Sequence, residues 1–322
     1  MPKRDQNHAP VKPRRSVLYL PGSNPRTHQK VRALPVDALI LDLEDAVGPG
    51  DKPEARKTVQ AALTEGGFGA RETVVRINGM DTPWGAEDLA AMASSGVDAI
   101  LVPKIRRGAD LVDVQARLDG LAEGHSSAGL PDLWAMIETP QSIVHAEEIA
   151  ALAARPDLPL KVFVMGTNDL ALETGAALVP GRQALVPWLQ TALVAARCHG
   201  VAVIDGVYNA IGDSDGYAAE CVQGRELGMD GKSIIHPDQI EVANSSFSPR
   251  PDEVEAAQAI LAAFARPEHR GKGVIQLDGR MVELLHAQMA ARTVAIADAI
   301  AARDLRIKAS CAHRLGPTFL ET

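Results

Sequence analysis

The chain has 322 residues, of which 46% are hydrophobic and 23% are charged, and its formal net charge is −8. This composition is typical of a globular protein with a large core, and the acidic balance argues against a nucleic-acid-binding surface. No stretch approaches the roughly 18 apolar residues that span a membrane. Residues 1–13 are polar, without the apolar core of a signal peptide, so we expect a disordered arm on a cytoplasmic protein.

Eight short apolar segments recur along the chain, separated by stretches with the spacing of amphipathic helices. Because the segments are apolar throughout rather than alternating, they predict parallel strands that are buried on both faces. Helix start signals fall between them; residues 51–63, for example, open with an acidic turn that contains a proline. In chain order the predicted strands are residues 16–20, 38–43, 73–77, 99–103, 133–137, 161–165, 201–205 and 232–236.

Eight alternating units favour a closed (β/α)8 TIM barrel over residues 14–247. An open, doubly wound sheet is the structural alternative. Such a sheet usually carries a glycine-rich phosphate turn after its first strand, whereas "LPGSNPR" has no GxGxxG pattern. Beyond the barrel, residues 251–266 and 281–303 predict helices. We therefore expect residues 248–322 to form a C-terminal helical extension that packs on the barrel or on a neighbouring subunit.

Polar residues follow the predicted strands at the point where each strand ends. In a barrel of this kind the carboxyl ends of the strands meet at one rim, where catalytic residues lie. A carboxylate after a strand often only caps the next helix, but so many polar residues at one rim indicate a functional site. These residues are Ser23, Asp42, Glu44, Asp45, Arg76, Asn78, Lys104, Glu138, Asn168, Asp169, Asp205 and His236.

Two carboxylates at this rim predict a metal site. Glu138 in "AMIETP" and Asp169 in "MGTNDLA" follow strands that are neighbours in the predicted barrel, so we expect their side chains to converge on one cation. Oxygen ligands without histidine pairs or thiolates favour Mg²⁺ or Mn²⁺ over zinc. Two protein carboxylates leave positions for water and for substrate oxygens.

Further groups are predicted to complete the site around this pair. Glu44 and Asp45 would accept hydrogen bonds from metal-bound water. The turn that opens the following helix, formed by Gly166, Thr167 and Asn168, would offer its backbone N–H groups to a substrate carboxylate. The sequence therefore predicts a cation and an anionic substrate side by side.

Eight segments between Arg15 and about Glu283 carry motifs of a known family in the expected order. They are "RSVLYLPGSNPRTHQK", "DALILDLEDAV", "TVVRING", "AILVPKI", "AMIETPQS", "VMGTNDLA", "GMDGKSIIHPDQI" and "LDGRMVE". Together they resemble the citrate lyase β-subunit-like branch of the HpcH/HpaI aldolase/citrate lyase superfamily, which includes malyl-CoA and citramalyl-CoA lyases. The resemblance implies a (β/α)8 barrel, Mg²⁺ on the glutamate of "ET" and the aspartate of "ND", coenzyme A as part of the substrate, and homotrimers or hexamers.

The resemblance also implies roles for single residues. Arg76 of "VRIN" would face the reacting centre and stabilise a developing oxyanion. Asp278 of "LDGRMV" would transfer a proton at a neighbouring subunit's active site, to which residues 248–322 would therefore contribute. Arg15 and Lys30 would contact the phosphates of coenzyme A, although Lys30 is equally explained as a solvated helix residue.

These implications predict an enzyme. It would be a Mg²⁺-dependent carbon–carbon lyase that reversibly cleaves a 3-hydroxyacyl-CoA of the malyl-CoA or citramalyl-CoA type to acetyl-CoA and glyoxylate or pyruvate. The same site suits a (3S)-malyl-CoA thioesterase, and a third alternative is the citryl lyase β subunit of a citrate lyase complex. A non-catalytic metabolite-binding barrel is the least favoured, because it needs no proton-transfer group such as Asp278.

Overall fold

The computed structural model describes residues 12–122 and 129–315. The predicted arm, residues 1–13, lies almost entirely outside this range, as does the end of the predicted extension, residues 316–322. The chain divides into two compact units, one formed by Arg14–Phe247 and a smaller one that contains the residues from Ser248 onward. Within the described residues, no helix is long and apolar enough to cross a membrane.

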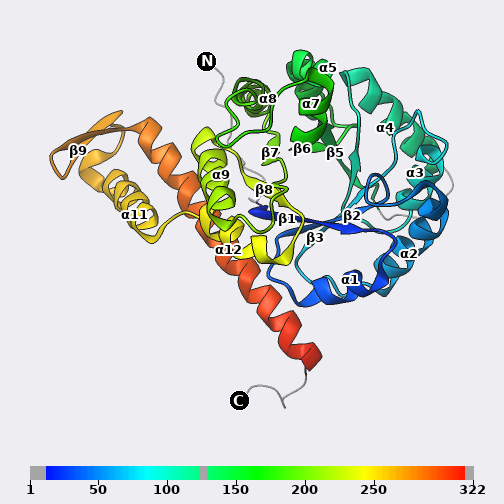
Figure 1. The fold of residues 1–322 in the computed structure, drawn as a ribbon. Helices are drawn as coiled ribbons and strands as arrows, with labels where there is room; N and C mark the ends of the chain where they lie inside the picture. The colour runs from blue at the N-terminus through cyan, green and yellow to red at the C-terminus, as the bar shows by residue number, and fades with distance from the viewer. Residues whose placement is uncertain (1–11, 123–128, 316–322) are drawn as a thin grey trace. The chain divides into compact units, whose positions relative to one another are not determined.

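The first unit is a closed barrel of eight parallel strands, in which each strand pairs with the next and β8 pairs with β1 (Figure 1). This arrangement confirms the predicted TIM barrel. The strands are β1 (Ser16–Pro21), β2 (Ala38–Asp42), β3 (Glu72–Arg76), β4 (Ala99–Val102), β5 (Asp132–Ile137), β6 (Leu160–Met165), β7 (Ala202–Asp205) and β8 (Gly231–Ile234).

Helices follow the strands and surround the barrel (Figure 1). Several begin at prolines, whose fixed φ suits a first helical turn; α5, for example, starts with a capping box at Thr139. The helices of this unit are α1 (Pro25–Lys30), α2 (Lys52–Glu65), α3 (Gly85–Ala93), α4 (Gly108–Ala122), α5 (Pro140–Val144), α6 (Ala146–Ala151), α7 (Thr167–Thr174), α8 (Val186–Cys198), α9 (Ser214–Leu227) and α10 (Ile240–Ser246).

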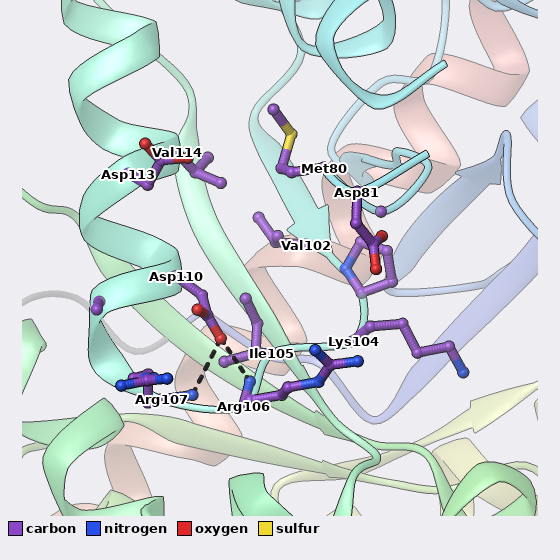
Figure 2. Close-up of a pocket in the computed structure, with 13 residues that line it drawn as sticks. Met80, Asp81, Val102, Lys104, Ile105, Arg106, Arg107, Asp110, Asp113 and Val114 are labelled. Atoms are coloured by element: carbon purple, nitrogen blue, oxygen red, sulfur yellow. Dashed lines mark hydrogen bonds between the residues drawn. The ribbon is translucent and has the colours of Figure 1, made fainter. Parts of the chain in front are cut away.

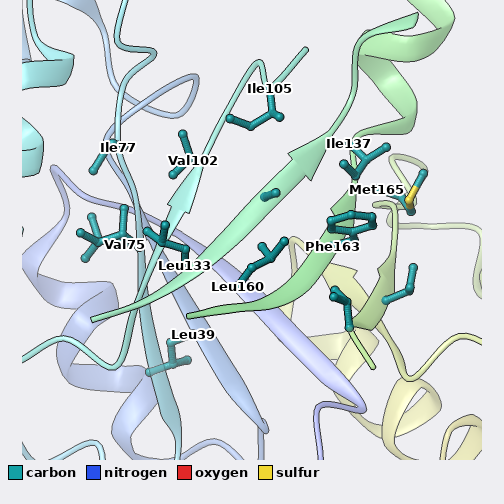
Figure 3. Packing of buried hydrophobic residues seen from close by; sticks show 14 of the residues in the cluster. Leu39, Val75, Ile77, Val102, Ile105, Leu133, Ile137, Leu160, Phe163 and Met165 are labelled. Atoms are coloured by element: carbon teal, nitrogen blue, oxygen red, sulfur yellow. The ribbon is translucent and has the colours of Figure 1, made fainter. Parts of the chain in front are cut away.

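Side chains of each strand alternate between the barrel interior and the layer under the helices. Trp134 and Val164 belong to the interior cluster, whereas Leu133, Phe163 and Met165 belong to the outer cluster (Figure 3). Both sets are buried, which explains why the strands read as continuous apolar runs. Because the side-chain period of a strand is two, the place of a residue in this alternation decides whether it faces the barrel mouth or the helices.

The second unit contains α11 (Pro251–Ala265), an antiparallel hairpin of β9 (Val274–Leu277) and β10 (Arg280–Glu283), and the long helix α12 (Leu284–Leu315). Ala263, Ile275 and Val282 form its small buried cluster. The two predicted helices are present, whereas the hairpin between them was not predicted, and residues 281–283 belong to β10 rather than to the second helix. The "DG" pair at Asp278 is a strong signal for a two-residue hairpin turn.

Candidate active site

A cavity of about 320 Å³ opens at the carboxyl ends of the barrel strands. Tyr19 and Met136 contribute side chains to it from inside the barrel. Several predicted site residues also line this cavity, namely Asp45, Arg76, Gly166, Thr167, Asn168 and Asp169. The structure therefore brings most of the predicted site together in one concave space, where a small ligand can be enclosed.

Arg76, at the end of β3, is held rigidly beneath this cavity. Its Nε and Nη2 atoms donate to the two carboxylate oxygens of Asp42 at 2.7 and 2.6 Å, and its guanidinium lies 5.0 Å from the centre of the Tyr19 ring. Burial alone would lower the pKa of Arg76, but the ion pair with Asp42 outweighs it and raises that pKa well above its usual value. The site thus contains a fixed, permanent positive charge.

Glu44 and Asp45, predicted to bind metal-bound water, both contact Arg76. Glu44 Oε2 lies 2.8 Å from Arg76 Nη1, without the alignment of a hydrogen bond, and Asp45 Oδ2 lies 3.4 Å from the same nitrogen. Burial raises the pKa of Glu44 to about 8, although Arg76 opposes this shift. The contact with metal-bound water stays a prediction.

Glu138 follows β5 and is completely buried. Its Oε1 accepts a hydrogen bond of 2.7 Å from the backbone N–H of Lys104, whereas its Oε2 has no hydrogen-bond partner among the described residues. Burial raises the pKa of Glu138 to about 7, against the nearby charge of Lys104. A buried carboxylate oxygen without a partner is costly unless a cation or a donor completes its environment.

Asp169 lies in the first turn of α7 and comes close to Glu138, as predicted from the neighbouring strands β5 and β6. Its Oδ1 pairs with the ammonium group of Lys104, and the same ammonium lies 3.8 Å from Glu138 Oε1. Burial alone would lower the pKa of Lys104, but the two carboxylates outweigh it and raise that pKa. One positive charge therefore already bridges the two acids.

The residues present fit a hard divalent cation. Glu138 offers an unpartnered oxygen, Asp169 a carboxylate whose side chain is 25% exposed, and oxygen donors suit Mg²⁺ or Mn²⁺. In the described part of the chain, no group of three or more His, Cys, Asp or Glu residues is placed to hold a metal. An ion here would thus rely on two protein carboxylates, with other positions left for water and substrate.

Gly166 has a packing role beside this pair. A Cβ atom at Gly166 would lie 2.3 Å from Glu138 Cβ and 2.8 Å from its Oε2, so only glycine lets β6 end so close to the carboxylate. The Gly166 N–H donates to the carbonyl of Ile137 at 3.0 Å and is not available to a substrate, which contradicts the predicted role. Thr167 and Asn168 begin α7, where backbone N–H groups lack intrahelical acceptors. Binding of a substrate carboxylate by these two N–H groups stays a prediction.

The two residues predicted to bind coenzyme A phosphates lie apart. Arg15 precedes β1, at the amino end of the barrel, and is buried in an ion pair with Asp37 at 2.9 Å. That end is opposite the cavity, so the structure does not support a coenzyme A contact for Arg15. Lys30 is exposed at the end of α1, which follows the carboxyl end of β1, and its role stays a prediction.

Asp278 belongs to the second unit, in the two-residue turn between β9 and β10. It has a left-handed backbone with φ of 49°, followed by Gly279 with φ of 76°. These angles suit the turn that joins two such strands. The turn geometry by itself explains why an Asp-Gly pair stands here. Proton transfer by Asp278 stays a prediction.

Two residues predicted at the rim instead face outward. Asp205 lies under the helices, paired with Arg182 at 2.7 Å and with Lys232 at 3.0 Å. The side-chain amide of Asn78 donates a hydrogen bond of 2.6 Å to Asp88, which lies on α3. Asp205 occupies an outward position in the strand alternation, whereas Asn78 lies two residues beyond the end of β3. Both contact the layer of helices and do not line the cavity.

Lys104 is the residue whose importance the sequence analysis missed. Its φ of 54° is left-handed, a conformation that costs a non-glycine residue about 1–3 kcal/mol and is often found at functional sites. Lys104 also lines a second cavity of about 370 Å³, between the loops after β3 and β4 and helix α4 (Figure 2). Its position after a barrel strand was a signal, but the backbone angle cannot be read from a sequence.

The raised pKa values of Glu44 and Glu138 predict how pH affects the protein. In the folded state both acids stay protonated at pH values above their ordinary pKa of 4.5. Their protonation therefore stabilises the fold at low pH, and this stabilisation is lost as the pH rises from 4.5 through about 8. A metal needs the ionised carboxylate. We therefore expect Mg²⁺ to bind about tenfold more tightly at pH 8 than at pH 6, as measured by calorimetry; equal affinity at both would contradict this expectation.

Comparisons with known proteins agree with this geometry. Residues 15–237 match the HpcH/HpaI aldolase/citrate lyase family. The chain is 48% identical over 290 residues to (3S)-malyl-CoA thioesterase of Cereibacter sphaeroides, covering 90% of this chain and 96% of that protein. It is 33% identical over 307 residues to L-malyl-CoA/beta-methylmalyl-CoA lyase of Rhodobacter capsulatus, covering 89% and 95%.

A solved structure extends the comparison to three dimensions. CitE from Mycobacterium tuberculosis, crystallised with magnesium, acetoacetate and coenzyme A, has a TM-score of 0.67 and 28% sequence identity. The similarity covers 88% of this chain and 98% of that one. The resemblance drawn from the motifs is therefore confirmed by family, relatives and fold: the chain belongs to the HpcH/HpaI aldolase/citrate lyase family.

Proposed function

We propose that this chain is a Mg²⁺-dependent thioesterase that hydrolyses (3S)-malyl-CoA or a close analogue to the free acid and coenzyme A. The observation that carries the proposal is the 48% identity to (3S)-malyl-CoA thioesterases over 90% of the chain. The sequence analysis placed carbon–carbon cleavage first and hydrolysis second. The comparisons favour the opposite order, because the lyase relative is 33% identical.

The metal would be held by Glu138 and Asp169, whose oxygens converge on one position. Bound there, Mg²⁺ or Mn²⁺ would supply Lewis acidity and a template for the carboxylate and hydroxyl of the malyl group. The N–H groups of Thr167 and Asn168, at the start of α7, would bind the same substrate carboxylate. These contacts orient the acyl chain along the floor of the cavity.

Arg76 would act on the reacting carbonyl. In hydrolysis, water adds to the thioester carbon, the carbonyl oxygen becomes an oxyanion, and its collapse breaks the carbon–sulfur bond. The thiolate of coenzyme A leaves, and the proton that the attacking water loses ends on its sulfur. Because Asp42 fixes the guanidinium of Arg76 through two hydrogen bonds, the positive charge is already in place when the oxyanion forms.

Carbon–carbon cleavage is the second candidate, and a specific observation favours it. The "LDGRMV" segment retains Asp278, which the family resemblance links to proton exchange at the acetyl carbon. Hydrolysis of the thioester needs no proton transfer to carbon. In this candidate, residues 248–322 of one subunit would serve the site of another within a homotrimer or hexamer, and Arg76 would stabilise the enolate.

Product analysis separates the two reactions. We expect (3S)-malyl-CoA incubated with the protein and Mg²⁺ to give malate and free coenzyme A, with oxygen-18 from labelled water in the malate. Acetyl-CoA and glyoxylate as the main products would overturn the hydrolytic assignment in favour of the lyase. In that case Asp278→Asn should stop deuterium exchange into the methyl group of acetyl-CoA, whereas hydrolysis should be insensitive to this substitution.

A further inference from the structure

The two candidate metal ligands share one partner, Lys104. Its backbone N–H donates to Glu138 Oε1 at 2.7 Å, while its ammonium pairs with Asp169 Oδ1 and lies 3.8 Å from the same Glu138 oxygen. Lys104 therefore contacts Glu138 through its main chain, and its ammonium group lies near both Glu138 and Asp169. Its ammonium lies where the two carboxylates converge.

The two contacts of Lys104 differ in how easily they change. The main chain lies two residues after the end of β4 with φ of 54°, and its N–H is directed at the buried oxygen of Glu138. The side chain ends a flexible four-carbon stem and is 31% exposed. The ammonium can therefore move away from the acids while the backbone contact remains.

We propose that Lys104 is the resident counter-ion of the Glu138–Asp169 pair: its ammonium balances the two carboxylates when no metal is bound and leaves them when Mg²⁺ binds. The inference rests on the metal assignment of the proposed function. An ammonium group has three donors that occupy carboxylate lone pairs, and Mg²⁺ needs those same oxygens. Metal binding is then an exchange of one cation for another, and Lys104 is a positioning residue that sets the affinity.

The displaced ammonium has a polar space close by. The cavity of about 370 Å³ has Lys104 and Asp81 on its walls, together with the apolar side chains of Met80 and Val114 (Figure 2). The Lys104 side chain points away from the other residues that line this cavity (Figure 2), so rotation of its side-chain bonds would be needed to bring the ammonium into it. Asp81 would offer its carboxylate to the displaced ammonium there.

Calorimetric titration of the full-length protein with MgCl₂ alone, at pH 8, tests the exchange. Lys104→Met removes the competing cation and keeps the backbone N–H. We expect it to bind Mg²⁺ at least about tenfold more tightly than the wild type, because a charge within 4–6 Å commonly biases a site by one to three powers of ten. Lys104→Arg retains the cation and should stay near the wild-type affinity. In EDTA, Lys104→Met should unfold at a lower temperature, since the two acids then face each other.

The matched control is Lys161→Met, which removes the same charge from an exposed lysine near the amino end of β6. An affinity of Lys104→Met that is no higher than that of Lys161→Met overturns the inference and leaves the proposed function standing. Absence of Mg²⁺ binding in the wild type and in Lys104→Met overturns both. If Lys104→Met does not fold, Lys104→Gln gives the same comparison with a neutral polar side chain.

Discussion

Glu138→Ala is expected to reduce metal-dependent turnover by about a thousandfold or more while the barrel stays folded. Lewis-acid stabilisation by a metal is worth several kcal/mol, and each 1.36 kcal/mol changes a rate tenfold. Glu138 supplies the buried, unpartnered oxygen of the pair, so its loss would remove one of the two proposed metal ligands. Stability should change little without metal, because burial of this acid raises its pKa and does not favour its charged form.

The measurement is kcat/KM with (3S)-malyl-CoA at several Mg²⁺ concentrations, with circular dichroism to check the fold. Glu173→Ala is the control, since Glu173 is an exposed acid on α7, the helix that carries Asp169. It should retain wild-type turnover. Full activity of Glu138→Ala, or of the wild type in EDTA, would contradict the metal assignment.

Arg76→Met is expected to be the most destabilising single substitution in the site. It leaves Asp42, which is 1% exposed, without the guanidinium that holds both of its oxygens. Removing one partner of a buried ion pair costs about 3–5 kcal/mol. Turnover should also fall by about 10²–10³-fold, the usual effect of losing a group that stabilises an oxyanion. Denaturant unfolding and kcat/KM measure the two effects.

A second substitution separates stability from catalysis in this ion pair. Arg76→Met combined with Asp42→Asn should recover much of the lost stability, because the buried charge is removed, but none of the lost turnover. Arg155→Met, at an exposed pair with Asp157, should leave both unchanged. Recovery of turnover in the double variant would show that Arg76 acts only by holding the fold.

The barrel could be predicted because each strand carries its own signal. Continuous apolar runs separated by helix starts recur eight times, and neighbours in sequence become neighbours in the sheet. The Glu138–Asp169 pair followed from this order, since β5 and β6 are adjacent. The closeness of these two acids follows from the order of the strands, which the sequence pattern predicts.

The direction of single side chains and the backbone conformation of single residues could not be predicted from the periodicity of the sequence. Asp205 ends a strand as Asp42 does, but the alternation turns it toward Lys232 and the helices. Arg15 precedes the predicted strand 16–20, so its place at the amino end of the barrel was already implied by the sequence, whereas its pair with Asp37 was not. The left-handed backbone of Lys104 depends on packing around one residue, which no local pattern specifies.

The position of Asp278 depends on the register in which β9 and β10 pair. Leu277 pairs with Arg280, so Asp278 and Gly279 form the whole turn. If the turn keeps two residues, inserting one residue there would slip the strands by one place and rotate the side chains of β10, Val282 among them, to the other face. Changes of length at this turn should therefore be tolerated far less than changes of residue type in the neighbouring strands.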